Sequence, residues 1–298
     1  MNEVQHVIIG AGISGLHLGQ LLKQKNITST IIEKSPGVGG RVATRRIDEL
    51  GLDHGAPFFE DAPQIREFLK TYKVDHLIKK DGEDLYLQGG MNQLGKSMAQ
   101  GLEIHRNVRA SFLKYQDEKW TIMTDEGPIF SSKTIILTAP LPQAMELLFN
   151  SGIPLTHDQE LKSIQYDKGI IGLFITQELS SSLKKIHPDG HKFLSMKERS
   201  LHPQGQVFLA NASFSEEYFG QSDFEILPIL LKLAEETCGN SLYVSSYQIK
   251  RWRYVKPRSA LTFPYLEVVP GLFLTGDSFL FPDIRGSFLS AEALAKIL

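Results

Sequence analysis

The sequence of 298 residues contains a single cysteine, Cys238. One cysteine excludes an internal disulfide and a cysteine-based metal cluster. Charge of one sign is not in excess either, since 32 Lys and Arg stand against 34 Asp and Glu. This balance disfavours broad electrostatic binding to nucleic acid or to an anionic membrane.

Long apolar runs are also missing. No stretch of about eighteen apolar residues occurs, so we expect no transmembrane helix. The first apolar run, Val7–Ile9, is too short for a secretory signal and leads directly into glycine. We therefore expect a cytoplasmic protein. The chain is long enough to bury a large core and to hold two domains.

Two kinds of catalytic site lack their signatures. The histidines show no metal-ligand spacing and no acidic residues cluster with them, which predicts that no metal is bound. No combination of Ser, His and Asp suggests a nucleophilic triad.

The N-terminus has the pattern of a strand, a glycine turn and a helix. A β-rich run, Val4–Ile9, is followed by Gly10-x-Gly12-x-x-Gly15 and by leucines at helical spacing. A second β-rich run then ends at Glu33. This is one βαβ element of a dinucleotide-binding fold.

Each position of this turn has a physical role. Gly10 permits the tight turn, Gly12 leaves space for a pyrophosphate, and Gly15 lets the helix pack closely on the strand. The helix N-terminus offers free N–H groups to the phosphates, and Glu33 can accept the hydroxyl hydrogens of an adenosine ribose. The fingerprint leaves FAD and NAD as alternatives. Other residues expected to contact the dinucleotide are Ala11, Ile13, Ser14 and Lys34.

The rest of the chain alternates β-rich and helical stretches. Short β runs between 103 and 137 predict an antiparallel meander that ends in a buried strand, Thr134–Thr138. Between 151 and 261, three further strands and a helix over Phe224–Thr237 are expected. The end predicts a strand, Leu272–Thr275, and a helix from about Arg285.

Three further segments resemble one family. They are the glycine-rich Gly37–Thr44, the run Asp53–Phe59, and the C-terminal Pro270–Asp277 with Arg285–Ala291. All three are similar to motifs of the flavin amine oxidase superfamily. The chain length, Gln88–Asn92 and Lys250–Pro257 look most like its renalase-like branch.

The resemblance implies FAD as the cofactor. It places Gly39, Gly40 and Arg41 at the pyrophosphate, Gly55 and Ala56 beside the isoalloxazine ring, Val108 at the adenine, and Gly276, Asp277, Arg285, Gly286 and Ser287 at the ribitol and flavin. Larger relatives often attach flavin through a cysteine near the C-terminal segment. Residues 252–260 contain none, so we expect noncovalent FAD.

The implied fold is α/β. A discontinuous Rossmann-type FAD-binding domain would comprise residues 1–56, 92–150 and 262–298. An inserted α+β substrate domain, built on a mostly antiparallel sheet, would comprise residues 57–91 and 151–261.

The implied reaction is oxidation of a reduced nicotinamide dinucleotide, of the standard or a non-standard dihydropyridine isomer. Hydride would pass to flavin N5, and O₂ would reoxidise the flavin to give H₂O₂. Alternatives are oxidation of a small amine or another cyclic donor, a flavin-binding sensor without turnover, and a plain NAD dehydrogenase.

Each residue proposed for the substrate side has two alternative interpretations, one functional and one structural. Lys168 is a catalytic candidate or a surface lysine, and Asn211 is a catalytic candidate or a helix cap. The expected substrate-facing residues are Phe59, Tyr247, Trp252 and Arg285. The aromatic residues could equally be core, and Arg285 could equally cap its loop.

Overall fold

The computed structural model describes residues 2–47, 50–155, 157–177, 184–195 and 204–298. The chain divides into two compact units. Unit 1 comprises Met1–Gly40, Leu94–Gln165 and Pro257–Leu298, and unit 2 comprises Arg41–Gln93 and Tyr166–Lys256. The predicted α/β class, with a Rossmann-like parallel sheet and separate antiparallel sheets, is confirmed. Which segments serve cofactor and which serve substrate stays a prediction.

Unit 1 is built on a sheet of eight described strands. Its main path is β17 (Leu266–Val269), β18 (Leu272–Leu274), β11 (Gly127–Leu137), β1 (Asn2–Ile9), β2 (Ser29–Glu33) and β8 (Glu103–Arg106). The pairs from β18 to β8 are parallel, and β17 is antiparallel to β18. The middle of the central strands is apolar and buried, as at Val7, Ile8 and Ile136, which is expected for a sheet covered on both faces.

The predicted meander is only partly right. The strands β9 (Phe112–Gln116), β10 (Lys119–Thr124) and β11 do form an antiparallel ribbon. The first β run, however, is β8, which lies parallel to β2 at the sheet edge. It follows a helix, α3 (Asn92–Met98), and a strand reached through a helix crossover pairs in parallel.

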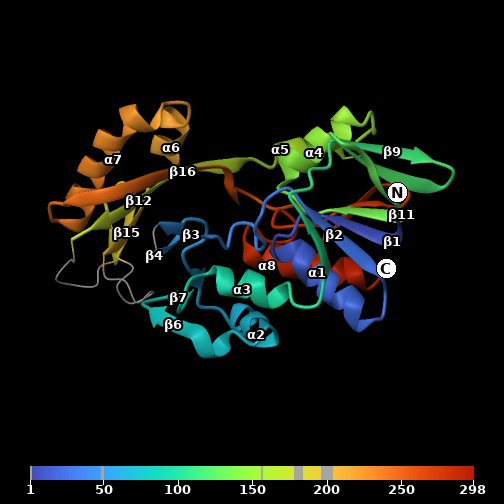
Figure 1. Ribbon diagram of the computed structural model, residues 1–298, viewed down its shortest axis with the longest axis horizontal. Helices are drawn as coiled ribbons and strands as arrows, with labels where there is room; N and C mark the ends of the chain where they lie inside the picture. Colours follow the sequence, from blue (N-terminus) through green and yellow to red (C-terminus); the bar gives the residue numbers. More distant parts are fainter. Residues whose placement is uncertain (1, 48–49, 156, 178–183, 196–203) are drawn as a thin grey trace. The chain divides into compact units, whose positions relative to one another are not determined.

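Two helices from opposite ends of the chain lie side by side in unit 1, α1 (Ile13–Gln24) and α8 (Ile284–Ala295) (Figure 1). His17 of α1 and Glu292 of α8 interact at 3.2 Å between Nε2 and Oε1. The other helices are α4 (Leu141–Asn150), which follows β11, and the short α5 (Asp158–Ser163).

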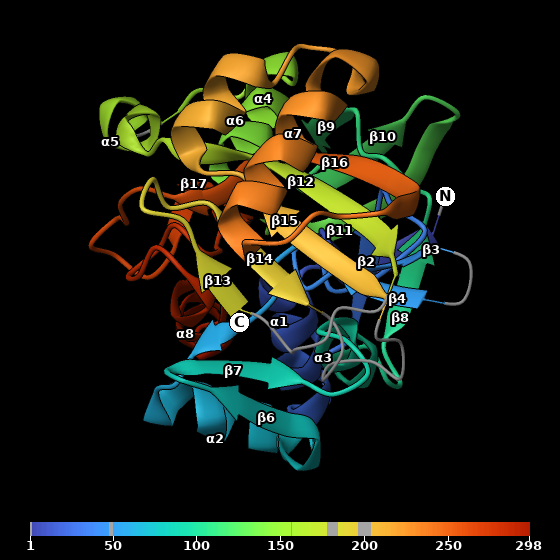
Figure 2. The same ribbon diagram turned by 90° about the vertical axis from the view of Figure 1, so that its left-hand side faces the viewer.

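Unit 2 has a five-stranded sheet in the order β13 (Lys184–Ile186), β14 (Lys192–Ser195), β15 (Gly205–Leu209), β12 (Tyr166–Thr176) and β16 (Val244–Pro257). The pairs from β13 through β15 to β12 are antiparallel. Helices α6 (Ala212–Tyr218) and α7 (Asp223–Cys238) cover one face (Figure 2), where Phe174, Phe193 and Phe208 are fully buried.

The opposite face of this sheet has a second apolar cluster. Ile171, Leu173, Leu194 and Val207 point to this side and pack with Leu52 of a hairpin. That hairpin consists of β3 (Thr44–Ile47) and β4 (Leu50–Asp53). The remaining elements are a three-stranded sheet of β5 (Phe59–Glu60), β7 (Asp84–Leu87) and β6 (Ile78–Asp81), helix α2 (Pro63–Thr71) and the 3₁₀ turn η1 (Asp75–Leu77).

Among the described helices, none has both the length and the apolar character that crossing a membrane requires.

Candidate functional site

The glycine turn after β1 has the geometry that the Gly10-x-Gly12-x-x-Gly15 fingerprint predicts. Gly10 has a φ of +114°, a conformation that side chains rarely adopt. A Cβ on Gly15 would collide with the carbonyl oxygen of Gly10, so the helix packs directly on the turn. A Cβ on Gly12 would instead meet nothing within 4 Å. Gly12 therefore faces open space, although its own backbone would tolerate a side chain.

Unused hydrogen-bonding groups gather at the start of α1. Gly12 is the N-cap and no side chain caps this helix end, so its first N–H groups have no intrahelical acceptor. Ser14, in the first turn, is only 4% exposed, and its Oγ has no hydrogen-bond partner within the described chain. A buried hydroxyl without a partner is costly. An anionic ligand at this helix end would satisfy both groups.

Glu33 is fixed beside the same turn. Its Oε2 accepts a hydrogen bond from the Ala11 N–H and its Oε1 accepts one from the Ser35 N–H, both at 2.8 Å. The Val108 N–H donates to the Glu33 carbonyl oxygen at 2.9 Å. The Lys34 side chain has another partner, since its Nζ donates to Gln143 Oε1 on the surface.

The second glycine segment packs over the first. The Gly39 N–H donates to the Ala11 carbonyl oxygen at 2.7 Å, and a Cβ on Gly40 would lie 3.1 Å from Gly12 Cα. Both residues have positive φ. Arg41, which begins unit 2, donates from Nη1 to the Val255 carbonyl oxygen at 3.2 Å. The predicted pyrophosphate residues 39 and 40 are thus adjacent to the N-terminal turn.

The C-terminal motif meets this turn at the carboxyl ends of the parallel strands. Thr138, at the end of β11, donates to the Gly10 carbonyl oxygen at 3.0 Å, and a Cβ on Gly276 would lie 3.8 Å from the Thr138 carbonyl oxygen. Asp277 is buried. A Cβ on Gly286 would collide with the Phe281 carbonyl oxygen, so α8 begins directly against the loop that follows Asp277.

Arg285 is engaged at the start of α8. Its guanidinium forms an ion pair with Asp283, with Nη2 at 2.5 Å from Oδ2 and Nε at 3.1 Å from Oδ1. It also lies over the Phe281 ring. Asp283 accepts from the Arg285 N–H as well and caps the helix. This arrangement favours the capping role over contact with an anionic substrate. Its neighbour Ser287 is buried.

In unit 2, His54 and Trp252 form a stacked pair with ring centroids 5.5 Å apart. The indole Nε1 donates to the His54 carbonyl oxygen at 2.6 Å. Gly55 has a local reason to lack a side chain, because a Cβ there would collide with the Arg41 carbonyl oxygen. The Ala56 N–H donates to that same oxygen at 2.7 Å. Trp252 is therefore fixed by its tertiary partners.

Asp53 organises the segment that precedes Gly55. It is 1% exposed, and its Oδ1 accepts from Thr44 Oγ1 at 2.5 Å and from the Met91 N–H at 3.0 Å. Thr44 Oγ1 in turn accepts from the Asn92 N–H. The Gln88–Asn92 motif thus has a structural explanation that its sequence did not suggest.

The two catalytic candidates have structural partners. Lys168 Nζ pairs with Glu216 Oε1 at 2.6 Å on the surface and lies over the Phe219 ring. Asn211 is the N-cap of α6, since its Oδ1 accepts from the Phe214 N–H and its Nδ2 donates to the Asp189 carbonyl oxygen. Both arrangements favour the structural alternatives. Of the aromatic candidates, Phe59 is buried and Tyr247 is 43% exposed.

A group of side chains that the sequence did not single out surrounds Phe58. The Nζ atoms of Lys184 and Lys192 lie 5.0 and 4.9 Å from the centroid of this ring. Lys184 forms an ion pair with Asp84. A lysine at the first position of a short strand is ordinary on a protein surface, so the sequence alone carries no signal for this group.

Comparison with known proteins identifies the family. The model of the flavin containing amine oxidoreductase family matches residues 54–292, which is more than half of the chain. The chain belongs to this family. A model of the NAD(P)-binding Rossmann-like domain also matches residues 8–72.

Several known proteins are similar to this flavin amine oxidoreductase. Renalase of Mus musculus is 21% identical, with 98% of both chains aligned. L-amino-acid oxidase of Siganus canaliculatus is 36% identical over 30% of this chain and 18% of its own length. The fold is shared with putrescine oxidase bound to putrescine (TM-score 0.74, 12% identity) and with a fatty acid isomerase from P. acnes (TM-score 0.74, 14% identity), over at least 98% of each chain.

The protein is therefore an FAD-dependent oxidoreductase that acts on a small-molecule substrate. The residues of unit 1 fit the cofactor, because the space at Gly12, the unpartnered Ser14 hydroxyl and the uncapped α1 N-terminus suit a diphosphate. Across the described residues, no group of three His, Cys, Asp or Glu side chains is placed to hold a metal ion.

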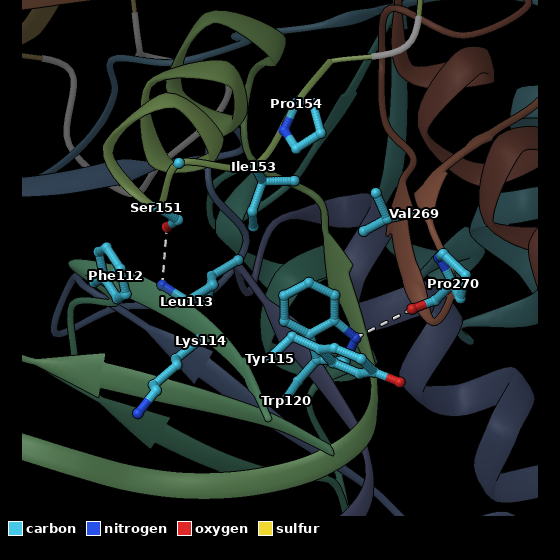
Figure 3. A pocket seen from close by; sticks show the side chains of 11 residues that line it. Phe112, Leu113, Lys114, Tyr115, Trp120, Ser151, Ile153, Pro154, Val269 and Pro270 are labelled. Atoms are coloured by element: carbon cyan, nitrogen blue, oxygen red, sulfur yellow. Dashed lines mark hydrogen bonds between the residues drawn. The ribbon is translucent and has the colours of Figure 1, made fainter. Parts of the chain in front are cut away.

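An apolar surface pocket of about 430 Å³ lies elsewhere on unit 1 of this flavin amine oxidoreductase (Figure 3). Phe112, Tyr115 and Trp120 line it, together with Ile153 and Pro270. Two of its polar side chains are engaged, since the Trp120 Nε1 donates to the Pro270 carbonyl oxygen and Ser151 Oγ accepts from the Leu113 N–H. Pro270 precedes β18, so the pocket is at the end of the strands opposite to the glycine turn.

His54 should make the fold sensitive to acid. Burial, together with the nearby positive charges of Lys250 and Arg45, lowers its pKa from 6.5 to about 4. Because the folded state holds the neutral ring, its contribution is complete above about pH 6.5 and is lost as the pH falls towards 4. The loss should reach about 3 kcal/mol. Urea unfolding at a series of pH values should show a shallower acid decline for His54→Gln than for the natural protein.

The exposed His76 provides the control for this measurement. His76→Gln should keep the pH dependence of the natural protein. An unchanged acid decline in His54→Gln would contradict the role of His54.

Proposed function

We propose that this flavin amine oxidoreductase oxidises a reduced nicotinamide dinucleotide and transfers the electrons to O₂. The observation that carries the proposal is the alignment with renalase over 98% of both chains, because the match includes unit 2 as well as the glycine turn of unit 1. Transfer of a hydride to a flavin requires position and stacking more than a catalytic base. The surface pairing of Lys168 and the capping role of Asn211 agree with that requirement.

When bound, FAD supplies a hydride acceptor and a site for reoxidation by O₂, so that a reduced nicotinamide, O₂ and a proton give the oxidised nicotinamide and H₂O₂. The chain binds and orients the cofactor. The backbone of Gly10–Gly15 and the Ser14 hydroxyl would hold the diphosphate. Glu33 would accept from the ribose hydroxyls with its remaining lone pairs, and the N-terminus of α8 near Gly286 would face the flavin beside Asp277.

The proposal includes noncovalent attachment of the flavin and a cytoplasmic location. Cys238 is a free cysteine, buried in the core of unit 2 among Ile226 and Leu230 of α7 and its neighbours. It is therefore a poor candidate for a covalent link. Acid precipitation of the protein should leave the yellow colour in the supernatant.

Anaerobic mixing of the purified holoprotein with reduced nicotinamides tests the reaction. The visible flavin band should bleach with dihydronicotinamide dinucleotides and remain with amines such as putrescine, and readmission of O₂ should restore the band and yield H₂O₂. Bleaching by amines alone would instead support an amine oxidase, an alternative favoured by the fold shared with putrescine oxidase. A flavin that no donor bleaches would indicate a binding module without turnover.

A further inference from the structure

Lys192 occupies a defined position on the sheet of unit 2. It is the first residue of β14, opposite Leu209 of β15 and Ile186 of β13. Residues two apart on a strand share a face, so Lys192 lies on the same face as Leu194. Leu194 packs with Val207 in the cluster that also contacts Trp252 and Phe58. Lys192 therefore lies on the face opposite to the one that α6 and α7 cover.

The positive charge of Lys192 has no acidic partner of its own. Its side chain is half-buried, and its Nζ makes no hydrogen bond or ion pair within the described residues, only the contact over the Phe58 ring. The other charged groups acting on it are Asp84, Lys184 and Lys256. Asp84 is already paired with Lys184. Within the described part of the chain, three lysines thus share one carboxylate.

This arrangement is unfavourable for the chain alone. Burial of an ammonium group removes water that stabilises its charge, and it lowers the pKa of Lys192. A cation–π contact with Phe58 compensates only part of that loss. Like charges nearby increase the cost further. An anion that approached this face would meet net positive charge, because the Asp84 carboxylate already balances Lys184 and leaves Lys192 without a counter-charge.

We propose that Lys192, with Lys184 and Phe58, recognises the diphosphate of the dinucleotide donor. The inference rests on the proposed function, since it assigns residues of unit 2 to that donor. An ammonium group offers three donors to phosphate oxygens, and such charged hydrogen bonds are strong. The same positive charge repels an amine donor, which is a cation near neutral pH. Lys192 is thus a residue that sets specificity for the donor, and the hydride transfer does not involve it.

The test compares two donors in the FAD-loaded full chain, the dinucleotide NADH and the phosphate-free 1-benzyl-1,4-dihydronicotinamide. Lys192→Met should raise the NADH concentration for half-maximal flavin reduction about tenfold or more, with the limiting rate of reduction within about twofold of the natural rate. Reduction by the benzyl compound should not change. Lys192→Arg, which keeps the charge, should restore most of the NADH affinity.

Lys185→Met is the matched control. Lys185 is the exposed neighbour of Lys184 in β13, and strand alternation places it on the opposite face. It should behave as the natural protein with both donors. An unchanged NADH dependence in Lys192→Met, or an equal loss with both donors, would overturn the inference while the proposed function stands.

A binding measurement separates the two proposals. Calorimetric titration of the oxidised holoprotein with NAD⁺ requires no turnover, and Lys192→Met should weaken this binding by a similar factor. If neither nicotinamide bleaches the natural protein, the proposed function fails. If NAD⁺ then also fails to bind, or binds equally to the natural protein and to Lys192→Met, the role of Lys192 fails as well.

Discussion

Gly12→Glu should abolish FAD binding and leave the fold intact. The space next to Gly12 is open, and its φ of −77° is accessible to any residue. A glutamate therefore fits the protein but extends into the space beside the glycine turn Gly10–Gly15, which we call the cradle. There its carboxylate would repel the diphosphate and occupy its position at the α1 N-terminus. We expect the Kd for FAD to rise at least a hundredfold, about 2.7 kcal/mol. Fluorescence titration of the apoprotein with FAD measures this directly.

Gly37→Glu is the matched control for the cradle. Gly37 belongs to the following glycine-rich segment, and a Cβ there also meets nothing within 4 Å. The same change of size and charge should leave FAD bound. Equal loss of flavin in both variants, or full flavin content in Gly12→Glu, would show that the cradle is not where the diphosphate binds.

Asp53→Ala should strongly destabilise unit 2. The variant leaves the Met91 N–H, in a residue that is 0% exposed, without its acceptor, and it releases the Thr44 hydroxyl. Loss of a buried charged acceptor with two donors should cost about 3 kcal/mol in the free energy of unfolding. Urea unfolding in excess FAD provides the measurement.

Two variants make this measurement specific. Asp53→Asn keeps an oxygen in the same place and should recover part of the loss. Asp81→Ala, at the exposed end of β6, should change stability by less than about 0.5 kcal/mol. If Asp53→Ala changed the free energy of unfolding as little as Asp81→Ala, water would replace the Asp53 carboxylate without penalty.

The cradle was predictable because its geometry is local. Gly10 and Gly15 are required by the close approach of a turn and a helix that are adjacent in sequence, so the spacing of the glycines carries the information. Gly55 illustrates the limit of such reasoning. Its motif suggested that backbone approaches a flavin ring, which stays a prediction, and the structure adds a close approach to the Arg41 carbonyl oxygen. A glycine in a motif does not reveal which atom approaches it.

The substrate side was less predictable because its residues depend on distant partners. Asn211 caps α6 and Trp252 donates to the His54 carbonyl oxygen, 198 positions away in the chain. Lys192 differs from any surface lysine only through Phe58 and Lys184, which the fold brings next to it. The placement of β8 beside β2 likewise depends on a crossover that its β propensity does not encode.

The packing of α1 against α8 has a consequence for biosynthesis. A ribosome makes α1 well before α8, and domains form in the order in which their residues emerge. The proposed flavin site draws on Gly12 at one end of the chain and on Asp277 and Gly286 at the other. Nascent chains would then remain colourless until α8 has left the exit tunnel, and capture of the cofactor would follow the synthesis of both helices.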